Sequence, residues 1–168
     1  MATKPPITRL YVIDTSYLLE LFNVPGSSNP SSVEKVKSRF EKAIKLGSSM
    51  YVPVPCIFEL GNRIAGVPDG EKRKGLAGAL FNAVRTSLRS SSPWTIIPYT
   101  QAFNLDWIVR AFSKTYVLQG IGLTDTNIIR EAERLKEKYG SMGQVHIWTM
   151  DKKMKAHEPD TEKNSFLG

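Results

Sequence analysis

The sequence has few residues of the types that build disulfides, zinc sites and cysteine nucleophiles. Cys56 is the only cysteine among 168 residues, which excludes an internal disulfide and a zinc site built from cysteines. Two histidines, His146 and His157, make a histidine-built zinc enzyme or a Cys–His nucleophile a poor interpretation. Any catalytic chemistry must therefore come from other side chains.

The chain also lacks the long apolar segments of membrane and secreted proteins. No run approaches the roughly 18 apolar residues that a membrane span needs. The first ten residues, MATKPPITRL, contain no apolar stretch of the kind found in a secretory signal. We therefore expect a cytoplasmic protein with no membrane partner.

Acidic residues are outnumbered by basic ones. The sequence holds 23 lysines and arginines against 16 aspartates and glutamates, a formal net charge of +7 at pH 7. This balance suits a polyanionic partner, most commonly nucleic acid, although an incidentally basic protein is the alternative. No repeat or boundary divides the chain, so we expect a single domain over residues 1–168, with 1–8 and about 160–168 flexible.

Short apolar runs alternate with helical patterns along the chain. The predicted strands are RLYVID (9–14), SMYVPVP (49–55), WTIIPY (94–99) and QVHIWTM (144–150). Helical patterns cover residues 17–22, 33–46, 56–66, 69–90, 102–118 and 123–135, with Ser32 and Thr124 as expected capping residues. This alternation predicts a three-layer α/β/α fold of the α/β class with a central, mostly parallel sheet.

Three aspartates stand at special places in this pattern. Asp14 and Asp151 end predicted strands, and sites in open parallel sheets form beyond the carboxyl ends of strands. Asp125 lies three and four residues before Ile128 and Ile129, offsets that share one helical face. A carboxylate at the head of a core-facing stripe is unusual, so we expect Asp125 to face the other two aspartates. Local alternatives are turn formation for the first two, and for Asp125 an interaction with the helix dipole worth roughly 0.3–1 kcal/mol.

Two further acids have simple surface interpretations. Glu59 could pair with Arg63, four residues later on the same predicted helix. Asp106 has the same spacing to Arg110 on the polar side of its helix, and we interpret it as a surface residue.

Four segments carry the clearest overall pattern. They are YVIDTSYLLELF, VPVPCIFELGNRIA, GLTDTNIIREA and VHIWTMDKKM, and their order covers nearly the whole chain. Together they resemble a PIN domain, the small nuclease fold of the VapC-type toxins. The resemblance implies an acidic cluster of Asp14, Glu59, Asp125 and Asp151, supported by the hydroxyls of Ser16 and Thr149.

The chain departs from this family's pattern after the last predicted strand. Family members often carry an arginine before the last aspartate and a further acid two residues after it. Here these positions are Met150 and Lys153, which implies fewer metal ligands. Segments 23–32 and 66–93 are also longer than in compact members.

Four carboxylates at one edge would repel one another. Two unit charges about 4 Å apart repel by about 4 kcal/mol at an effective dielectric constant near 20. A divalent cation removes this repulsion, and all-oxygen ligands favour Mg²⁺ or Mn²⁺ over zinc. We expect Asp14, Asp125 and Asp151 to bind the metal, and Glu59 to bind metal or orient the attacking water. The resemblance implies a metal-dependent endoribonuclease that hydrolyses phosphodiester bonds of single-stranded or structured RNA.

An RNA substrate would give the basic residues a role. The predicted helix 69–90 carries residues that could follow the phosphate backbone, namely Lys72, Arg73, Lys74, Arg85 and Arg89. Tyr51, Trp94 or Tyr99 could stack bases, the alternative for each being a core aromatic. The resemblance also implies a small cognate antitoxin at the acidic cluster and a homodimer.

Single residues argue against two other functions. A phosphatase of the haloacid dehalogenase type needs a second aspartate two residues after the first, where this chain has Ser16. A response-regulator receiver needs an aspartate at the end of a middle strand, and YVPVPCIFEL has none. The remaining rival is a PIN-fold module that binds RNA or protein without cutting. Lys153 permits it, but four retained acids argue against it, because idle like charges destabilise a fold.

Overall fold

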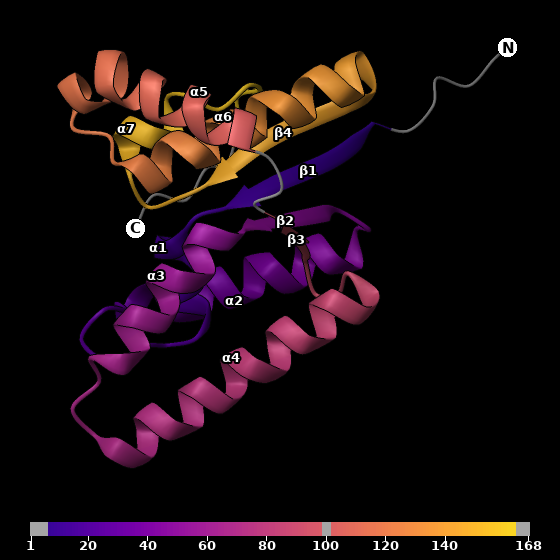
Figure 1. The fold of residues 1–168 in the computed structure, drawn as a ribbon. Coiled ribbons are helices and arrows are strands. Elements are labelled where there is room, and N and C mark those ends of the chain that lie inside the picture. Colours follow the sequence, from indigo (N-terminus) through magenta and orange to yellow (C-terminus); the bar gives the residue numbers. More distant parts are fainter. Residues whose placement is uncertain (1–6, 99–101, 164–168) are drawn as a thin grey trace, which may run out of the picture.

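The computed structural model describes residues 7–98 and 102–163 as alternating strands and helices (Figure 1). The strands are β1 (Thr8–Ile13), β2 (Ser49–Pro53), β3 (Thr95–Ile97) and β4 (Gly143–Trp148). The helices are α1 (Thr15–Leu21), α2 (Pro30–Lys45), α3 (Val54–Ala65), α4 (Gly70–Ser90), α5 (Ala102–Ala111), α6 (Leu123–Tyr139) and α7 (Lys152–Lys155).

The four strands form one parallel sheet in the order β3-β2-β1-β4. Figure 1 shows α5 and α6 on one side of this sheet, and α2 and α4 on the other. The predicted three-layer α/β/α fold with a parallel central sheet is therefore confirmed. Because all strands run in the same direction, their carboxyl ends meet at one edge of the sheet.

Strand β1 lies in the middle of the core. Leu10 and Val12 are fully buried, and Leu10 is opposite Ser49 of β2 and Val145 of β4. Helix α6 packs its apolar stripe onto the same strands, so that Ile128 and its neighbours in the stripe are buried as the periodicity predicts. The residue that follows β1 is therefore held at the centre of the carboxyl edge.

The start of α2 differs from the prediction that Ser32 caps it. The helix begins at Pro30, and the side chain of Asn29 caps it by accepting a hydrogen bond from the Ser31 backbone N–H at 3.1 Å. Ser32 is buried inside the first turn. Proline suits the first helical position, since its missing N–H has no intrahelical partner there, and the helix starts three residues earlier than predicted.

Two other element ends differ from the sequence pattern. Strand β2 stops at Pro53, and Val54 already belongs to α3, although the apolar run predicts strand to residue 55. The long helix predicted over 102–118 is α-helical only to Ala111, and it continues as a π-helical turn (Phe112–Tyr116) and a 3-10 turn (Val117–Gln119). These turns span only five and three residues, which is too short for their different periods to show in the apolar pattern.

The segment after α7 packs along β4, although the sequence predicts little structure there. The backbone N–H of Val145 donates to a carboxylate oxygen of Asp160 at 2.8 Å, and the Asp160 N–H donates to the Val145 carbonyl at 3.1 Å. Glu158 accepts from the Ile147 N–H at 3.1 Å in the same way. Because β4 is an edge strand, these groups satisfy backbone donors that have no neighbouring strand. The expected flexibility from about residue 160 is thus not found for 160–162, while 1–6 and 164–168 lie outside the described residues.

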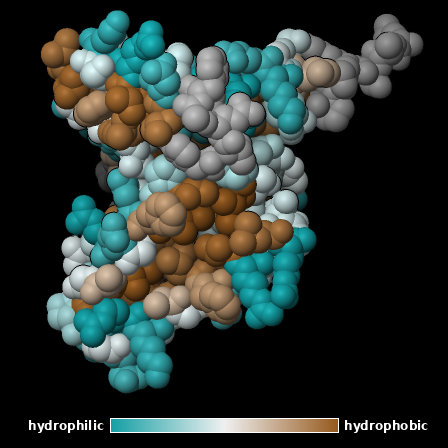
Figure 2. Space-filling model, in the orientation of Figure 1, coloured by the Kyte–Doolittle hydropathy of each residue, from teal (hydrophilic) through white to brown (hydrophobic). Residues whose placement is uncertain are grey.

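Helix α4 has fewer buried residues than α2 or α3. Ser87 is its only buried residue, whereas Phe81 and Leu88 are 62% and 71% exposed. In Figure 2, hydrophobic residues gather in the middle of the visible face, in the region between α3 and α4. Among the described helices, none is both long and apolar enough to cross a membrane.

Candidate metal centre at the acidic edge

Asp14 occupies the centre of the carboxyl edge, directly after β1. Its backbone N–H donates to the Trp148 carbonyl at 3.0 Å, which ties it to the end of β4. Its side chain is buried, and the carboxylate oxygen Oδ2 accepts hydrogen bonds from Ser16 Oγ at 2.5 Å and Thr149 Oγ1 at 2.9 Å. Asp14 therefore does not act as a simple turn residue, because its carboxylate is turned into the protein toward two hydroxyls.

Burial raises the pKa of Asp14 to about 6. The hydroxyls of Ser16 and Thr149 lower this pKa, since they donate to the charged form, while the negative charge of Asp125 raises it further. A carboxyl group in this position is poised to be neutralised by a proton or by a cation.

The two predicted supporting hydroxyls also organise the segment after β4. Ser16 Oγ accepts from the Met150 backbone N–H at 3.0 Å, and Thr149 Oγ1 accepts from the Asp151 backbone N–H at 3.0 Å. Each hydroxyl therefore donates to Asp14 and accepts from the backbone that leads into α7. These four hydrogen bonds hold Asp14 and Asp151 at neighbouring strand ends.

Asp151 is exposed, as Glu59 is, and it also caps α7. Its Oδ1 accepts from the Lys153 backbone N–H at 2.7 Å, so the local turn role considered from the sequence is observed, and here it caps α7. The Asp151 charge nonetheless contributes to raising the pKa of Asp125. The Lys153 ammonium lies close to Gly120. A Cβ atom added at this glycine would be 3.3 Å from Lys153 Nζ.

Asp125 lies in the first turn of α6, half-buried at the head of the apolar stripe. Its Oδ2 accepts from the Gly122 backbone N–H at 3.2 Å, which caps the helix. Burial raises the pKa of Asp125; the Gly122 N–H opposes this, and the charges of Glu59 and Asp151 add to it. Asp125 therefore combines the predicted local role at the helix start with proximity to the other acids.

Glu59 is held from two sides by threonine hydroxyls. Thr15 Oγ1 of α1 donates to Glu59 Oε2 at 2.8 Å, and Thr124 Oγ1 of α6 donates to Glu59 Oε1 at 2.8 Å. The surface pair with Arg63 considered from the sequence is not found among the described residues, so the Glu59 carboxylate faces the other acids instead. The expectation that Thr124 caps α6 is wrong: Gly122 is the capping residue, and the Thr124 hydroxyl reaches Glu59.

Thr15 and Thr124 are the site residues that sequence reasoning missed. Each stands directly beside a predicted acid, in the strings DTS and LTD. This position beside an acid is the one sequence feature that points to a role in the site. A threonine beside an aspartate at a helix start is, however, most simply interpreted as a cap or turn residue. Their contact with Glu59 crosses between elements and could not be read from local pattern.

The thiol of Cys56 is fully buried beneath the acidic edge. Burial raises its pKa well above the usual range, and the charges of Asp14, Glu59 and Asp125 raise it further. A neutral buried thiol is neither a nucleophile nor a metal ligand. The exclusion of cysteine chemistry from composition therefore agrees with the position of this residue.

The donor set of the acidic edge is oxygen only, as Mg²⁺ and Mn²⁺ prefer. In the described part of the chain, the only three possible metal ligands with atoms within 4.8 Å of one another are His146, Glu158 and Glu162. That trio already holds a cation, because Lys155 Nζ lies 2.6 Å from Glu158 and 3.0 Å from Glu162. The four edge acids are thus coupled by charge but stand too far apart for one tight all-protein shell. Mg²⁺ keeps several waters and binds through one or two carboxylates, so the residues present fit such an ion.

The basic and aromatic residues that were predicted to contact RNA do not gather at one place as the acids do. All five predicted basic residues lie exposed on α4. Arg73 donates to the Val67 carbonyl at 3.0 Å. Contact of these residues with RNA stays a prediction. Trp94 is 2% exposed and packs against Phe40, so it is a core aromatic and not a stacking surface. Tyr51 is half-buried, and Tyr99 lies outside the described residues.

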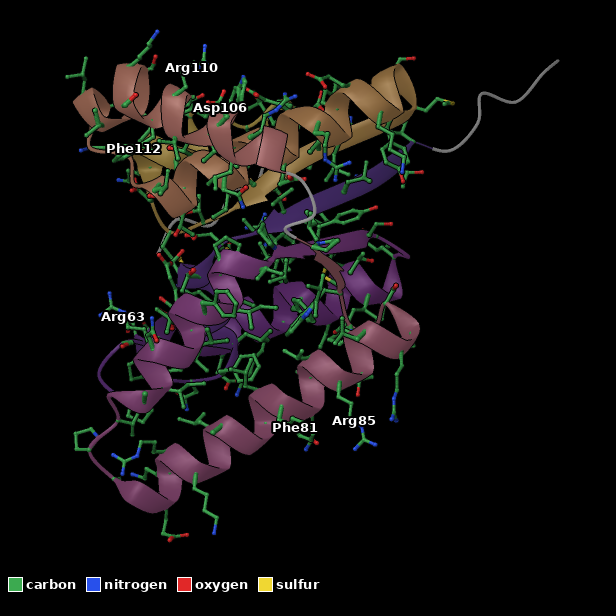
Figure 3. All side chains as sticks on the ribbon, in the orientation of Figure 1. Arg63, Phe81, Arg85, Asp106, Arg110 and Phe112 are labelled. Atoms are coloured by element: carbon green, nitrogen blue, oxygen red, sulfur yellow. The ribbon has the colours of Figure 1, made fainter. Side chains whose placement is uncertain are left out.

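The interpretation of Asp106 as a surface residue is confirmed. It pairs with Arg110 at 3.0 Å on α5, with both side chains exposed (Figure 3). Asp106 is a matched control for Asp125, because it has the same side chain without a place at the acidic edge.

Comparison with known proteins assigns no family to this chain. No protein-family model matches it, and no curated protein matches it either.

Proposed function

We propose that this protein is a Mg²⁺- or Mn²⁺-dependent endoribonuclease with its active site at the acidic edge. The observation that carries the proposal is the gathering of Asp14, Glu59, Asp125 and Asp151. Four different elements or their ends supply these acids, and the charge of Asp125 is coupled to that of each of the other three. So many acids at one edge repel each other unless a cation is bound, and such an arrangement is typical of a functional site.

Asp14, Asp125 and Asp151 would hold the ion, one or two of them directly and the rest through its bound waters. Ser16 and Thr149 would keep Asp14 oriented and ionised, because they donate only to its carboxylate Oδ2 in the observed hydrogen bonds. A bound divalent ion lowers the pKa of its water and stabilises negative charge on a phosphoryl oxygen.

Glu59 would orient the attacking water or accept its proton. Both of its oxygens already accept a hydroxyl hydrogen bond, so its carboxylate plane is held relative to α1 and α6. A carboxylate can accept a further hydrogen bond at each oxygen, which leaves capacity for a water molecule. The two threonines thus supply the orientation that general-base catalysis requires.

RNA is the proposed substrate because the net charge of +7 favours a polyanion and because the four-segment resemblance is to an RNA-cutting fold. The toxin role, a small antitoxin at the acidic edge, and a homodimer belong to the same proposal. The second candidate is a PIN-like module that binds without cutting. The separation of the four acids and the lysine at position 153 favour it, since both reduce the number of preformed metal ligands.

Cleavage of a mixed pool of labelled single-stranded and hairpin RNAs tests the proposal. Four reactions are compared: wild type with Mn²⁺, wild type with EDTA, Asp125→Asn with Mn²⁺, and Asp106→Asn with Mn²⁺. We expect cutting in the first and last reactions only. Equal cutting by Asp125→Asn would place the active site elsewhere, and metal-dependent RNA binding without cutting in any reaction would favour the second candidate.

A further inference from the structure

Helix α4 carries apolar side chains on more of its surface than its packing uses. Leu76, Leu80 and Ala83 face the core of the protein. Beside them, Phe81 and Leu88 are 62% and 71% exposed. A helix that only covered the sheet would carry polar residues at these outer positions.

Phe81, Val84 and Leu88 form what we call the outer face of α4. Their spacing of three and four residues places them on one side of the helix. Figure 2 shows hydrophobic residues gathered next to this face, in the region between α3 and α4, and α3 exposes Phe58 to 67%. Exposed apolar surface of this kind marks an interaction site more often than single scattered side chains do.

The outer face is bordered by positive charge. The guanidinium carbon of Arg85 lies 6.0 Å from the centre of the Phe81 ring, and Figure 3 shows both side chains on the same stretch of α4. Arg89 follows one turn later, beside Leu88. Along its whole length α4 has five basic residues and a single acidic one, Glu71.

This charge distinguishes among the possible occupants. A second copy of the chain would bring two basic helices together, so their charges would oppose association through this face. Single-stranded RNA matches the charge and can stack on Phe81, but Val84 and Leu88 offer no aromatic ring to a base. An apolar stripe with helical spacing and a cationic border is complementary to an amphipathic helix with a carboxylate border.

We propose that the outer face of α4 is a docking site for an acidic amphipathic helix of a partner protein. The apolar stripe of the partner packs on Phe81, Val84 and Leu88, and its carboxylates pair with Arg85 and Arg89. The site lies on a different element from the four acids, so the proposal holds whether or not the acidic edge cuts RNA.

A displayed library of helical peptides tests this docking site. The peptides keep leucine or phenylalanine at positions i, i+3, i+4 and i+7, and their flanking positions vary among Glu, Lys, Gln and Ser. After selection on the full chain we expect glutamate to exceed lysine at the flanks by about tenfold, the effect of a few rim ion pairs. On the double variant Arg85→Glu/Arg89→Glu the preference reverses toward lysine, whereas Arg110→Glu, an exposed arginine on α5, leaves it unchanged.

The apolar part is tested with Phe81→Ser/Leu88→Ser, at exposed positions where circular dichroism can verify the fold. This variant should lose the selected peptides. Retained binding, or equal enrichment of glutamate and lysine on wild type, overturns the proposal. It is also overturned if the same variant abolishes a dimer in sedimentation, which would assign the face to a second copy, or abolishes binding of a labelled oligouridine, which would assign it to RNA.

Discussion

Thr124 Oγ1 donates a hydrogen bond to Glu59 Oε1 at 2.8 Å, and this contact joins the first turn of α6 to α3 across 65 positions of sequence. Thr15 completes the arrangement from the opposite side. Glu59 lies on an otherwise exposed part of its helix, so these hydroxyls decide where its carboxylate points. They convert a residue with an ordinary surface position into a member of the acidic edge.

Thr124→Val should lower the rate of metal-dependent RNA cleavage by about 10–100-fold, the usual cost of losing a group that orients an active-site ligand. Thr124→Ser keeps the hydroxyl and should retain most of the rate. Single-turnover kinetics with saturating Mn²⁺ measures both variants, and their melting temperatures control for stability. Equal rates in the valine and serine variants would show that the hydrogen bond does not position Glu59 for the reaction.

Asp14→Asn should stabilise the metal-free protein at neutral pH. The folded-state pKa of Asp14 is about 6, above its ordinary value of 3.8, so the folded protein prefers the protonated form. The stability contributed by this group is complete below pH 3.8 and is lost as the pH rises through about 6. Relative to the variant, wild type should therefore lose about 3 kcal/mol of unfolding free energy across this window.

Urea denaturation of both proteins from pH 3 to pH 8, with EDTA present, measures this difference. Only the difference between wild type and variant is used, because other titrating groups affect both proteins alike. A variant that is less stable than wild type at pH 7 would mean that the buried charge of Asp14 is stabilised by more than the two hydroxyls.

Mn²⁺ should raise the melting temperature, and the shift should grow with pH. A ligand present at about 100 times its Kd stabilises a protein of this size by about 5–10 °C. Bound metal requires ionised Asp14, so the shift should be small at pH 5 and larger above pH 6. Differential scanning fluorimetry measures it, with Asp106→Asn as the control that keeps the shift and Asp125→Asn as the variant that reduces it. A pH-independent shift would indicate metal binding at other residues.

Glu162→Gln should destabilise the fold by about 1–3 kcal/mol, because it leaves buried donors without a charged acceptor. Burial tends to raise the pKa of Glu162, but the charges of Arg39 and Lys155 prevail and lower it below the ordinary range. This stabilisation is therefore present above the ordinary glutamate pKa and is lost as the pH falls through the lowered value.

Chemical denaturation at pH 7 and pH 3 checks both the size and the pH dependence of this effect. Glu34→Gln is the matched control, since Glu34 is 82% exposed and lies 3.7 Å from Lys37, and it should change stability very little. If the two variants behaved alike, the packing of the C-terminal segment on β4 would not depend on the ion pairs.

Local pattern determined a large part of this protein. Apolar runs that end at Asp14 and Asp151, alternating with helical stripes such as the one from Ile128 to Leu135, predicted a parallel sheet between helices. The same patterns placed three aspartates at its carboxyl edge. Periodicity succeeds here because burial on one face of an element imposes a local repeat.

Tertiary structure decided what depends on contacts between distant elements. It turned Glu59 away from Arg63 and toward Thr15 and Thr124, although helical spacing alone favoured the surface pair. It also placed Asp160 and Glu162 along the edge of β4, where unpaired backbone groups and basic side chains hold a tail without periodicity. Such pairings depend on how helices and strands pack against one another. They leave no local repeat in the sequence from which they could be predicted.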